Sequence, residues 1–318
     1  MLDRGRGLTD ARRVLPSLSE WQAQGRQVTV HGRRVFVVER GQPDRPAVVI
    51  LHGYPTSSHD WSRVLVQLSA SYRIVVHDHL GFGLSEKPTD YSYSLVEQAE
   101  IAVGLWRQLG IDRAHLIAHD YGTSVATEIL ARAERQPWGI TFESLTLSNG
   151  SVHIELAKPR LIQHLLANPT LGPTVAQLAS FSTLKRNFTR IIATKGALED
   201  HDLRTIWELI EREDGRARLP QISRYLDERR KFWHRWIGAL TRLEIPTLVL
   251  WGDQDPVARN VIAEALAGEI PGARLQWLTG VGHYPMVEVP DRYGAAVLGF
   301  LGVKSTQPPD ALRELGPR

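Results

Sequence analysis

The chain has 318 residues, of which 42% are hydrophobic and 23% are charged, a balance that suits one α/β domain carrying an insertion. It contains no cysteine, so disulfides, thiolate catalysis and cysteine-ligated metals are excluded. The formal net charge of +3 is small for this length, and we expect no nucleic acid partner. The densest basic cluster, which we interpret as the solvated face of a helix, consists of Arg229, Arg230, Lys231 and Arg235.

The N-terminal segment has no apolar stretch of signal-peptide length, and residues 1–18 are expected to form a flexible arm. No later stretch reaches ~18 uninterrupted apolar residues, the length that a membrane span requires. We therefore expect a cytoplasmic enzyme without membrane insertion. Nothing in the sequence predicts a cofactor or a metal site.

After this arm, strand patterns alternate with helix patterns. Residues 28–40 read as two antiparallel strands joined by a turn at His31–Gly32. Short apolar runs then alternate with amphipathic stretches, which indicates a mostly parallel sheet with helices on both faces. We expect eight strands in total. The apolar runs are 47–53, 73–78, 114–120 and 142–150, and the helical stretches include 94–110 and 121–135.

The alternation stops after Gly150 and resumes near residue 245. The intervening residues contain helical segments rich in Trp, Arg and Pro, without a convincing strand. Strands at 245–253 and 274–280 follow, each with a helix after it. The sequence thus predicts an α/β core interrupted by a helical lid between the sixth and seventh strands. The expected boundaries are 19–150 and 241–303 for the core, 151–240 for the lid and 304–318 for a flexible tail.

The segment LIAHDYGTS (116–124) reads as a strand, a sharp turn and a helix. Its turn has the form small-x-nucleophile-x-Gly, with Ala118, Asp120 and Gly122 at the three key positions. This pattern resembles the nucleophile elbow of α/β-hydrolases, with Asp in place of Ser. The elbow strains the backbone and raises the carboxylate above the sheet at a helix N-terminus, where negative charge is favoured. The alternative is that Asp120 only caps the helix.

Two further motifs support the reading of Asp120 as a nucleophile. LHGYPTSSHDW (51–61) follows the third strand, where the fold supplies one oxyanion N–H, here from Tyr54, and the residue after the nucleophile, Tyr121, supplies the second. GVGHYP (280–285) places His283 after the last strand, at the position of the base. The Gly-rich loop 78–88 is interpreted as structural. Supporting hydrogen-bonding roles are expected for His52, His77, His79 and His119.

The acid that orients His283 should follow the seventh strand, where WGDQDPV offers Asp253 and Asp255. With either acid the chain order is nucleophile, acid, histidine, which is the α/β-hydrolase order. A carboxylate nucleophile suits displacement at a saturated carbon, which leaves an ester on Asp120. His283 would then activate a water that hydrolyses the ester. Epoxides and haloalkanes are the two common substrates of such chemistry.

HGYPTSSHDW, AHDYG, WGDQDP and GVGHYP together resemble the epoxide hydrolase and haloalkane dehalogenase branch of the α/β-hydrolases. The likeness is closest to the mesoderm-specific transcript protein family, with which the chain also shares LTLSNG and the lid segment RRKFWHRWIGAL, and it extends over roughly residues 18–302. The resemblance implies Asp255 as the acid, since the family carries it at the fourth place of Gly-x-x-Asp, with Asp253 as the fallback. It also implies that Tyr225 donates a proton to the epoxide oxygen, because its separation from the Ile-Pro pair at 245–246 looks like that of a lid tyrosine of epoxide hydrolases.

The sequence departs from both branches of the family. Dehalogenases usually carry Trp after the nucleophile and often Asn after His-Gly, whereas this chain has Tyr121 and Tyr54. Epoxide hydrolases often have that Trp too, and they normally have a second lid tyrosine, which residues 151–224 lack. Trp207, Trp233 and Trp236 of the lid are candidates for the pocket wall rather than for halide binding.

These observations favour an epoxide hydrolase that converts a small apolar epoxide and water to a vicinal diol. The first alternative is a haloalkane dehalogenase that works by the same covalent mechanism, with lid tryptophans as halide donors. The second is a non-catalytic member of the fold that binds a small ligand. An ordinary esterase is disfavoured, because a carboxylate that attacks an acyl carbon forms a mixed anhydride.

Overall fold

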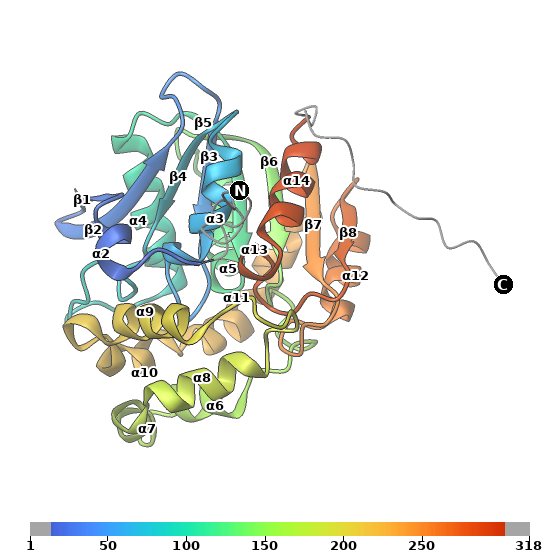
Figure 1. Ribbon diagram of the computed structural model, residues 1–318. Helices are drawn as coiled ribbons and strands as arrows, with labels where there is room; N and C mark the ends of the chain where they lie inside the picture. Colours follow the sequence, from blue (N-terminus) through green and yellow to red (C-terminus); the bar gives the residue numbers. More distant parts are fainter. Residues whose placement is uncertain (1–13, 303–318) are drawn as a thin grey trace, which may run out of the picture.

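The computed structural model describes residues 14–302, which contain one eight-stranded sheet (Figure 1). The strand order is β1-β2-β4-β3-β5-β6-β7-β8, and the predicted eight-stranded, mostly parallel sheet is confirmed. β2 pairs antiparallel with β1 and with β4, and the other five strand pairs are parallel. The strands are β1 (Arg26–Val30), β2 (Arg33–Arg40), β3 (Ala47–Leu51), β4 (Arg73–His77), β5 (Arg113–His119), β6 (Thr141–Ser148), β7 (Thr247–Gly252) and β8 (Arg274–Leu278).

Burial follows the position of each strand in the sheet. Every residue of β3 and of β7 is buried, since helices cover both faces of the parallel strands. The edge strand β1 has one buried residue, Val30. The β1–β2 turn is formed by His31 and Gly32, both at positive φ, as a two-residue hairpin of the favoured twist requires.

Helices cover the two faces of the sheet. On one face α3 (Ser62–Leu68) contacts α14 (Pro290–Phe300), and on the other α4 (Leu95–Gln108) contacts α5 (Tyr121–Ala133) (Figure 1). The remaining core elements are α2 (Leu18–Gln22), the 3₁₀ turn η1 (Ser58–Trp61), α12 (Asn260–Glu269) and α13 (Pro285–Glu288). No helix within residues 14–302 has both the length and the apolar character that a membrane span needs.

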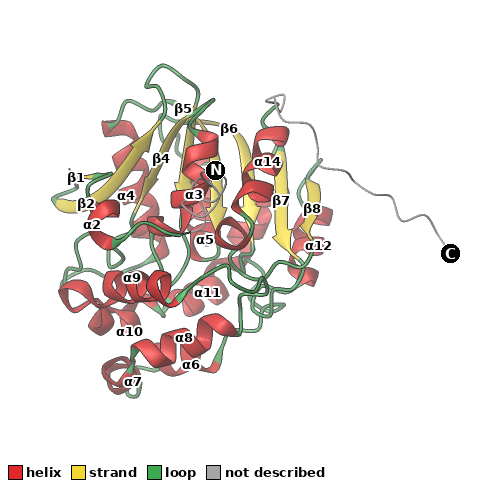
Figure 2. Ribbon diagram, in the orientation of Figure 1, coloured by secondary structure: helices red, strands yellow, loops and turns green. Residues whose placement is uncertain are grey.

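The segment between β6 and β7, here called the helical insertion, contains helices and no strand within its described residues. Its helices α6 to α10 lie beyond the carboxyl ends of the parallel strands (Figure 2). Its last helix, α11, packs instead along α5 of the core. The elements are α6 (Leu161–Ala167), α7 (Gly172–Leu178), α8 (Phe181–Thr189), α9 (Asp200–Glu211), η2 (Arg212–Arg218), α10 (Leu219–Ile222) and α11 (Tyr225–Leu240).

Residues 1–13 of the expected arm at 1–18 and the whole of the expected tail at 304–318 lie outside the described residues. The part of the arm that is described is packed into the fold. Leu15 is buried, and its N–H donates to Asp202 Oδ1 of α9 at 2.9 Å. The Pro16 carbonyl accepts a hydrogen bond from His59 Nε2 at 2.7 Å. The folded part therefore begins before the expected boundary at residue 19.

The basic cluster on α11 does not form one solvated face. Arg230 and Lys231 are exposed, as expected, but Arg229 is only 2% exposed and Arg235 is partly buried in an ion pair with Glu128 of α5. The expectation is therefore wrong for Arg229. The reason is that α11 lies along α5, so one side of the helix faces the core.

Candidate active site

Asp120 lies between the end of β5 and the start of α5, in a strained backbone conformation with φ 46° and ψ −108°. A glycine at 122 is required because a Cβ there would lie 2.5 Å from the carbonyl oxygen of Leu51. Asp120 occupies the N-cap position of α5, yet its side chain makes no capping hydrogen bond. The carboxylate is therefore directed elsewhere, and helix capping does not explain this residue.

The carboxylate of Asp120 lies between the loop after β3 and the loop after β8. Its Oδ1 accepts a hydrogen bond from the Tyr54 N–H at 2.9 Å. The loop after β3 approaches the elbow closely, since a Cβ on Gly53 would lie 2.9 Å from the Asp120 Cβ. The other carboxylate oxygen, Oδ2, lies 3.5 Å from His283 Nε2. One oxygen thus faces a backbone donor and the other faces an imidazole.

His283 is oriented by Asp255. Its Nδ1 donates to Asp255 Oδ2 at 2.7 Å. Asp255 Oδ1 accepts from the N–H groups of Val257 at 2.7 Å and Ala258 at 3.0 Å, and Asn149 Nδ2 donates to Oδ2 at 2.8 Å. These donors fix the orientation of the Asp255 carboxylate, which in turn fixes the tautomer of His283.

The second candidate acid, Asp253, lies elsewhere. Its Oδ1 accepts the Gly280 N–H at 2.7 Å in an exposed turn. The structure therefore brings Asp120, His283 and Asp255 together and leaves Asp253 out.

Asn149 is a member of this cluster that sequence reasoning missed. It directly follows β6 at positive φ, donates to Asp255 and accepts the Gly252 N–H at 3.0 Å. It thereby ties the ends of β6 and β7 together beneath the acid. The Asn-Gly pair that closes the strand run 142–150 was the signal that could have revealed it.

The pKa values of Asp120 and His283 are shifted by burial and by each other's charge. Burial alone would raise the pKa of the Asp120 carboxyl, but the hydrogen bond and charge of His283, with a contribution from Arg229, lower that pKa below its usual value. Burial alone would lower the pKa of His283, but Asp255 and Asp120 raise it above its usual value. The resting site therefore holds a carboxylate next to an imidazolium.

The backbone N–H groups predicted to bind an oxyanion lie on either side of Asp120. Tyr54 N–H already donates to Oδ1, and Tyr121 is the first residue of α5, so its N–H has no carbonyl partner within the helix. The Tyr121 ring is buried between His79 and Phe82 of the loop after β4. The ring is therefore part of the core.

The buried histidines support the loops around the site. His52 Nδ1 donates to the Gly53 carbonyl at 2.8 Å, and its Nε2 accepts the His79 N–H at 3.0 Å. His119 Nε2 donates to the His283 carbonyl at 2.8 Å. Burial lowers the pKa of His52 and of His119 to about 4, so both rings are neutral at pH 7. His77 and His79 are also buried, with pKa values lowered by burial, but their ring nitrogens have no hydrogen-bond partner among the described residues. The expected hydrogen-bonding role is therefore wrong for these two side chains, which pack with the aromatic core instead.

A cavity of about 120 Å³ extends from Asp120 and His283 into the helical insertion. The core contributes Tyr54, Val257 and Tyr284 to its wall. The insertion contributes a mostly apolar surface that includes Ile162, Leu166, Leu184, Phe188, Ile191, Trp207 and Ile210, with the polar side chains of Arg160, Gln163 and Asn187. An apolar cavity that ends at a carboxylate suits a small apolar substrate.

Of the predicted pocket residues in the insertion, Trp207 lines this cavity, whereas Tyr225, Trp233 and Trp236 do not. Trp236 is fully buried, and its Nε1 donates to Glu128 Oε2 at 2.7 Å. Tyr225 lies behind the wall, where its hydroxyl accepts from Gln163 Nε2 at 2.7 Å. In these three cases the structure differs from the expectation, because helical periodicity does not reveal which side of α11 faces the cavity.

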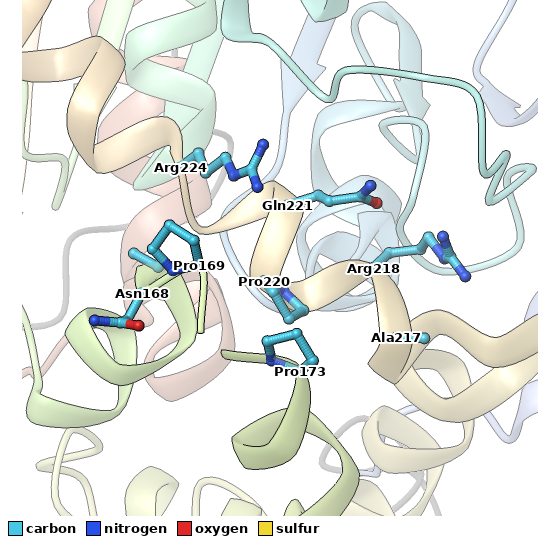
Figure 3. Close-up of a pocket in the computed structure, with 9 residues that line it drawn as sticks. Asn168, Pro169, Pro173, Ala217, Arg218, Pro220, Gln221 and Arg224 are labelled. Atoms are coloured by element: carbon cyan, nitrogen blue, oxygen red, sulfur yellow. The ribbon is translucent and has the colours of Figure 1, made fainter. Parts of the chain in front are cut away.

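A second cavity, of about 210 Å³, lies within the insertion and is lined by prolines and by Asn168, Arg218, Gln221 and Arg224 (Figure 3). None of the predicted site residues lines it. It is separate from the carboxylate and the imidazole, so the candidate active site is the cavity at Asp120 and His283.

The chain matches the family model described as the alpha/beta hydrolase fold over residues 46–290. It is 39% identical over 287 residues to the putative hydrolase LipZ of Mycobacterium tuberculosis, with 90% of this chain and 98% of that protein covered. It is 35% identical over 297 residues to the mesoderm-specific transcript homolog protein of Bos taurus, with coverages of 90% and 88%.

Among solved structures, that of a putative ancestral haloalkane dehalogenase is similar in fold, with a TM-score of 0.73 at 22% identity over 87% of this chain and 98% of that one. The family model covers more than half of the chain, and the resemblance to the mesoderm-specific transcript proteins is confirmed. The chain therefore belongs to the α/β-hydrolase fold family.

Proposed function

We propose that this protein is an epoxide hydrolase that works through an ester of Asp120. The observation that carries the proposal is the orientation of the Asp120 carboxylate, which leaves the helix uncapped and points Oδ2 toward His283. In the first step Oδ2 attacks an epoxide carbon, and the carbon–oxygen bond of the ring breaks. Oδ1 remains hydrogen-bonded to the Tyr54 N–H and becomes the carbonyl oxygen of the ester.

Loss of the Asp120 charge prepares the second step. The resting carboxylate helps to raise the pKa of His283, so forming the ester removes one cause of that rise and favours the neutral imidazole. Neutral His283 takes a proton from a water that attacks the Asp120 Cγ. Negative charge on Oδ1 is stabilised by the N–H groups of Tyr54 and Tyr121. The bond from Cγ to the ester oxygen then breaks, and the diol leaves with the proton from His283. The Asp120 carboxyl gives its remaining proton to His283. The proton that His283 lost on ester formation replaces the one donated to the epoxide oxygen, so the resting carboxylate and imidazolium return.

Turnover in heavy-oxygen water tests this mechanism. With enzyme in excess over styrene oxide, we expect the label in the carboxylate of the Asp120 peptide, because the diol carries away the oxygen that Asp120 supplied. Mass analysis of that peptide measures the result. Label in the diol alone, after confirmed turnover, would show that water attacks the epoxide directly and would overturn the ester mechanism.

Tyr225 is the proposed proton donor to the epoxide oxygen. Its hydroxyl accepts from Gln163, so its own hydrogen remains available, and burial raises the pKa of the phenol, which keeps it protonated. Its ring lies 5.5 Å from that of Tyr54, and both Tyr54 and Gln163 line the cavity. Turning the Gln163 side chain aside would open the Tyr225 hydroxyl to the substrate.

Tyr225→Phe should slow diol formation from styrene oxide by about 10²-fold, the lower end of the range for a lost general acid. Any bromide release from 1-bromobutane should be unchanged, because a halide leaves without a proton. Tyr121→Phe is the matched control, since the Tyr121 hydroxyl is buried and its residue does not line the cavity. Equal effects of the two variants on diol formation would remove Tyr225 from the mechanism.

A haloalkane dehalogenase is the second candidate, favoured by one observation. Trp207 lines the cavity, and its indole is the type of donor that binds a leaving halide. Bromide release from 1-bromobutane without diol formation from styrene oxide would establish this candidate in place of the first.

A further inference from the structure

Arg229 is an arginine of the helical insertion that lies within the core of the molecule. It is 2% exposed, although it is flanked on α11 by the exposed Arg230. Its Nε donates to Ser124 Oγ at 2.8 Å, and its Nη2 donates to the backbone carbonyl of Asp120 at 3.1 Å. Neither partner is a carboxylate. A buried charge that is hydrogen-bonded only to neutral groups costs stability, so its position calls for an explanation beyond packing.

The Asp120 carbonyl oxygen is unusually rich in donors. Besides Arg229 it accepts from the Thr123 N–H at 3.2 Å and from Thr123 Oγ1 at 2.6 Å. This carbonyl belongs to the same peptide group as the Tyr121 N–H. Donors on the oxygen of a peptide polarise it and strengthen the N–H at its other end as a donor.

The Tyr54 N–H, the second donor of the oxyanion site, belongs to a peptide that is polarised in a similar way by a neutral side chain. The Gly53 carbonyl, in the peptide that carries the Tyr54 N–H, accepts from His52 Nδ1 at 2.8 Å. In each of the two peptide groups that supply an N–H to the oxyanion, the carbonyl thus accepts a hydrogen bond from a buried side chain, which polarises the peptide. Only the Asp120–Tyr121 peptide accepts from a side chain with a full positive charge, Arg229.

We propose that Arg229 is a positioning residue that polarises the Asp120–Tyr121 peptide and so strengthens the Tyr121 N–H toward the oxyanion of ester hydrolysis. The inference rests on the proposed function, since it concerns the ester on Asp120. Arg229 also lies over the Tyr225 ring, with its Cζ 4.5 Å from the ring centroid, so one guanidinium contacts both the elbow and the proposed proton donor.

The two half-reactions should respond differently to this charge. In ester formation negative charge leaves Asp120 and appears on the Tyr225 oxygen. The guanidinium opposes the loss of charge from Asp120 but favours the charge on Tyr225, so the two effects offset each other. In ester hydrolysis negative charge forms on Asp120 Oδ1, and the same cation favours it. Loss of a residue that only supported the fold would slow both steps to a similar extent.

Arg229→Gln separates these possibilities when both steps are measured with styrene oxide by rapid quenching and intact-protein mass. We expect hydrolysis of the ester to slow by about 10-fold, less than for loss of a whole oxyanion donor. Ester formation should change much less than ester hydrolysis, because the two effects of the guanidinium on that step offset each other, so the alkylated enzyme accumulates. Arg229→Lys should restore part of the hydrolysis rate. The exposed neighbour Arg230→Gln should leave both rates unchanged.

Proportional slowing of both steps, or an unchanged hydrolysis rate, would overturn the inference. If Arg229→Gln does not fold, Ser124→Ala loosens the guanidinium without removing its charge and should slow the same step by a few-fold; no slowing would contradict the inference. Failure of the proposed function would look different. No alkylated enzyme would then form in the wild type or in any of these variants.

Discussion

Asp120→Asn should abolish turnover, with a fall in kcat on the order of 10⁴-fold, because the amide oxygen is too poor a nucleophile to open an epoxide. The fold should survive the change. Asn tolerates positive φ better than most residues, and its Oδ1 can accept the Tyr54 N–H as Asp120 does. We expect the free energy of unfolding to change by about 1 kcal/mol or less. Diol release and chemical denaturation measure the two quantities.

Two controls make this result interpretable. Asparagine next to a histidine can hydrolyse back to aspartate, so the mass of the Asp120 peptide must be checked before and after the assay. Asp120→Ala cannot revert, and it should be equally inactive. More than a tenth of the wild-type activity in Asp120→Ala would mean that the carboxylate is not the nucleophile.

His283→Gln should stop the reaction after one half-cycle. Ester formation needs only the carboxylate and a proton donor, whereas hydrolysis needs the imidazole that Asp255 orients. We expect kcat to fall on the order of 10³-fold or more, with one molecule of substrate retained per active site. Loss of the imidazole should also remove the rise in hydrolysis rate with pH that follows from deprotonation of His283 in the ester.

The mass of the trapped enzyme identifies the substrate class. An epoxide adds to Asp120 as a whole molecule, so the protein gains its full mass. A bromoalkane transfers only its alkyl group and releases bromide. His283→Gln enzyme that stays unmodified by both reagents would show that the histidine is needed before the ester forms, contrary to the proposed order of steps. Asp253→Asn is the matched control. Because Asp253 lies in an exposed turn away from the site, this variant should turn over substrate at the wild-type rate and retain none.

The sheet and the cluster around Asp120 were predictable because strong local signals determine them. β3 is a continuous buried apolar run, and parallel strands bring their carboxyl ends, with the loops that follow, to one edge of a sheet. The motifs at Asp120 and His283 therefore had to meet. The choice of Asp255 over Asp253 needed the family pattern, since both acids follow the same strand.

The insertion was less predictable because some of its side chains face the cavity and others pack on α5 of the core. Periodicity indicates that α11 has an apolar side, but it does not reveal whether that side meets the cavity or α5. Arg229 looks like its exposed neighbours in the sequence, and only the packing of α11 on α5 brings it to the Asp120 carbonyl. For the same reason the sequence predicts that Trp236 lines the pocket, whereas in the structure its indole N–H donates to Glu128 of α5.

The packing of α11 on α5 affects the design of chimeras in which the helical insertion is exchanged between relatives to change the substrate range. The cavity-lining side chains of the insertion come from residues 160–219, ahead of α11, whereas α11 supplies the guanidinium that contacts the Asp120 carbonyl. A chimera with its second crossover ahead of Tyr225 imports a new cavity wall and keeps the resident cation. A crossover after α11 replaces both at once, so a change in rate could no longer be assigned to the wall alone.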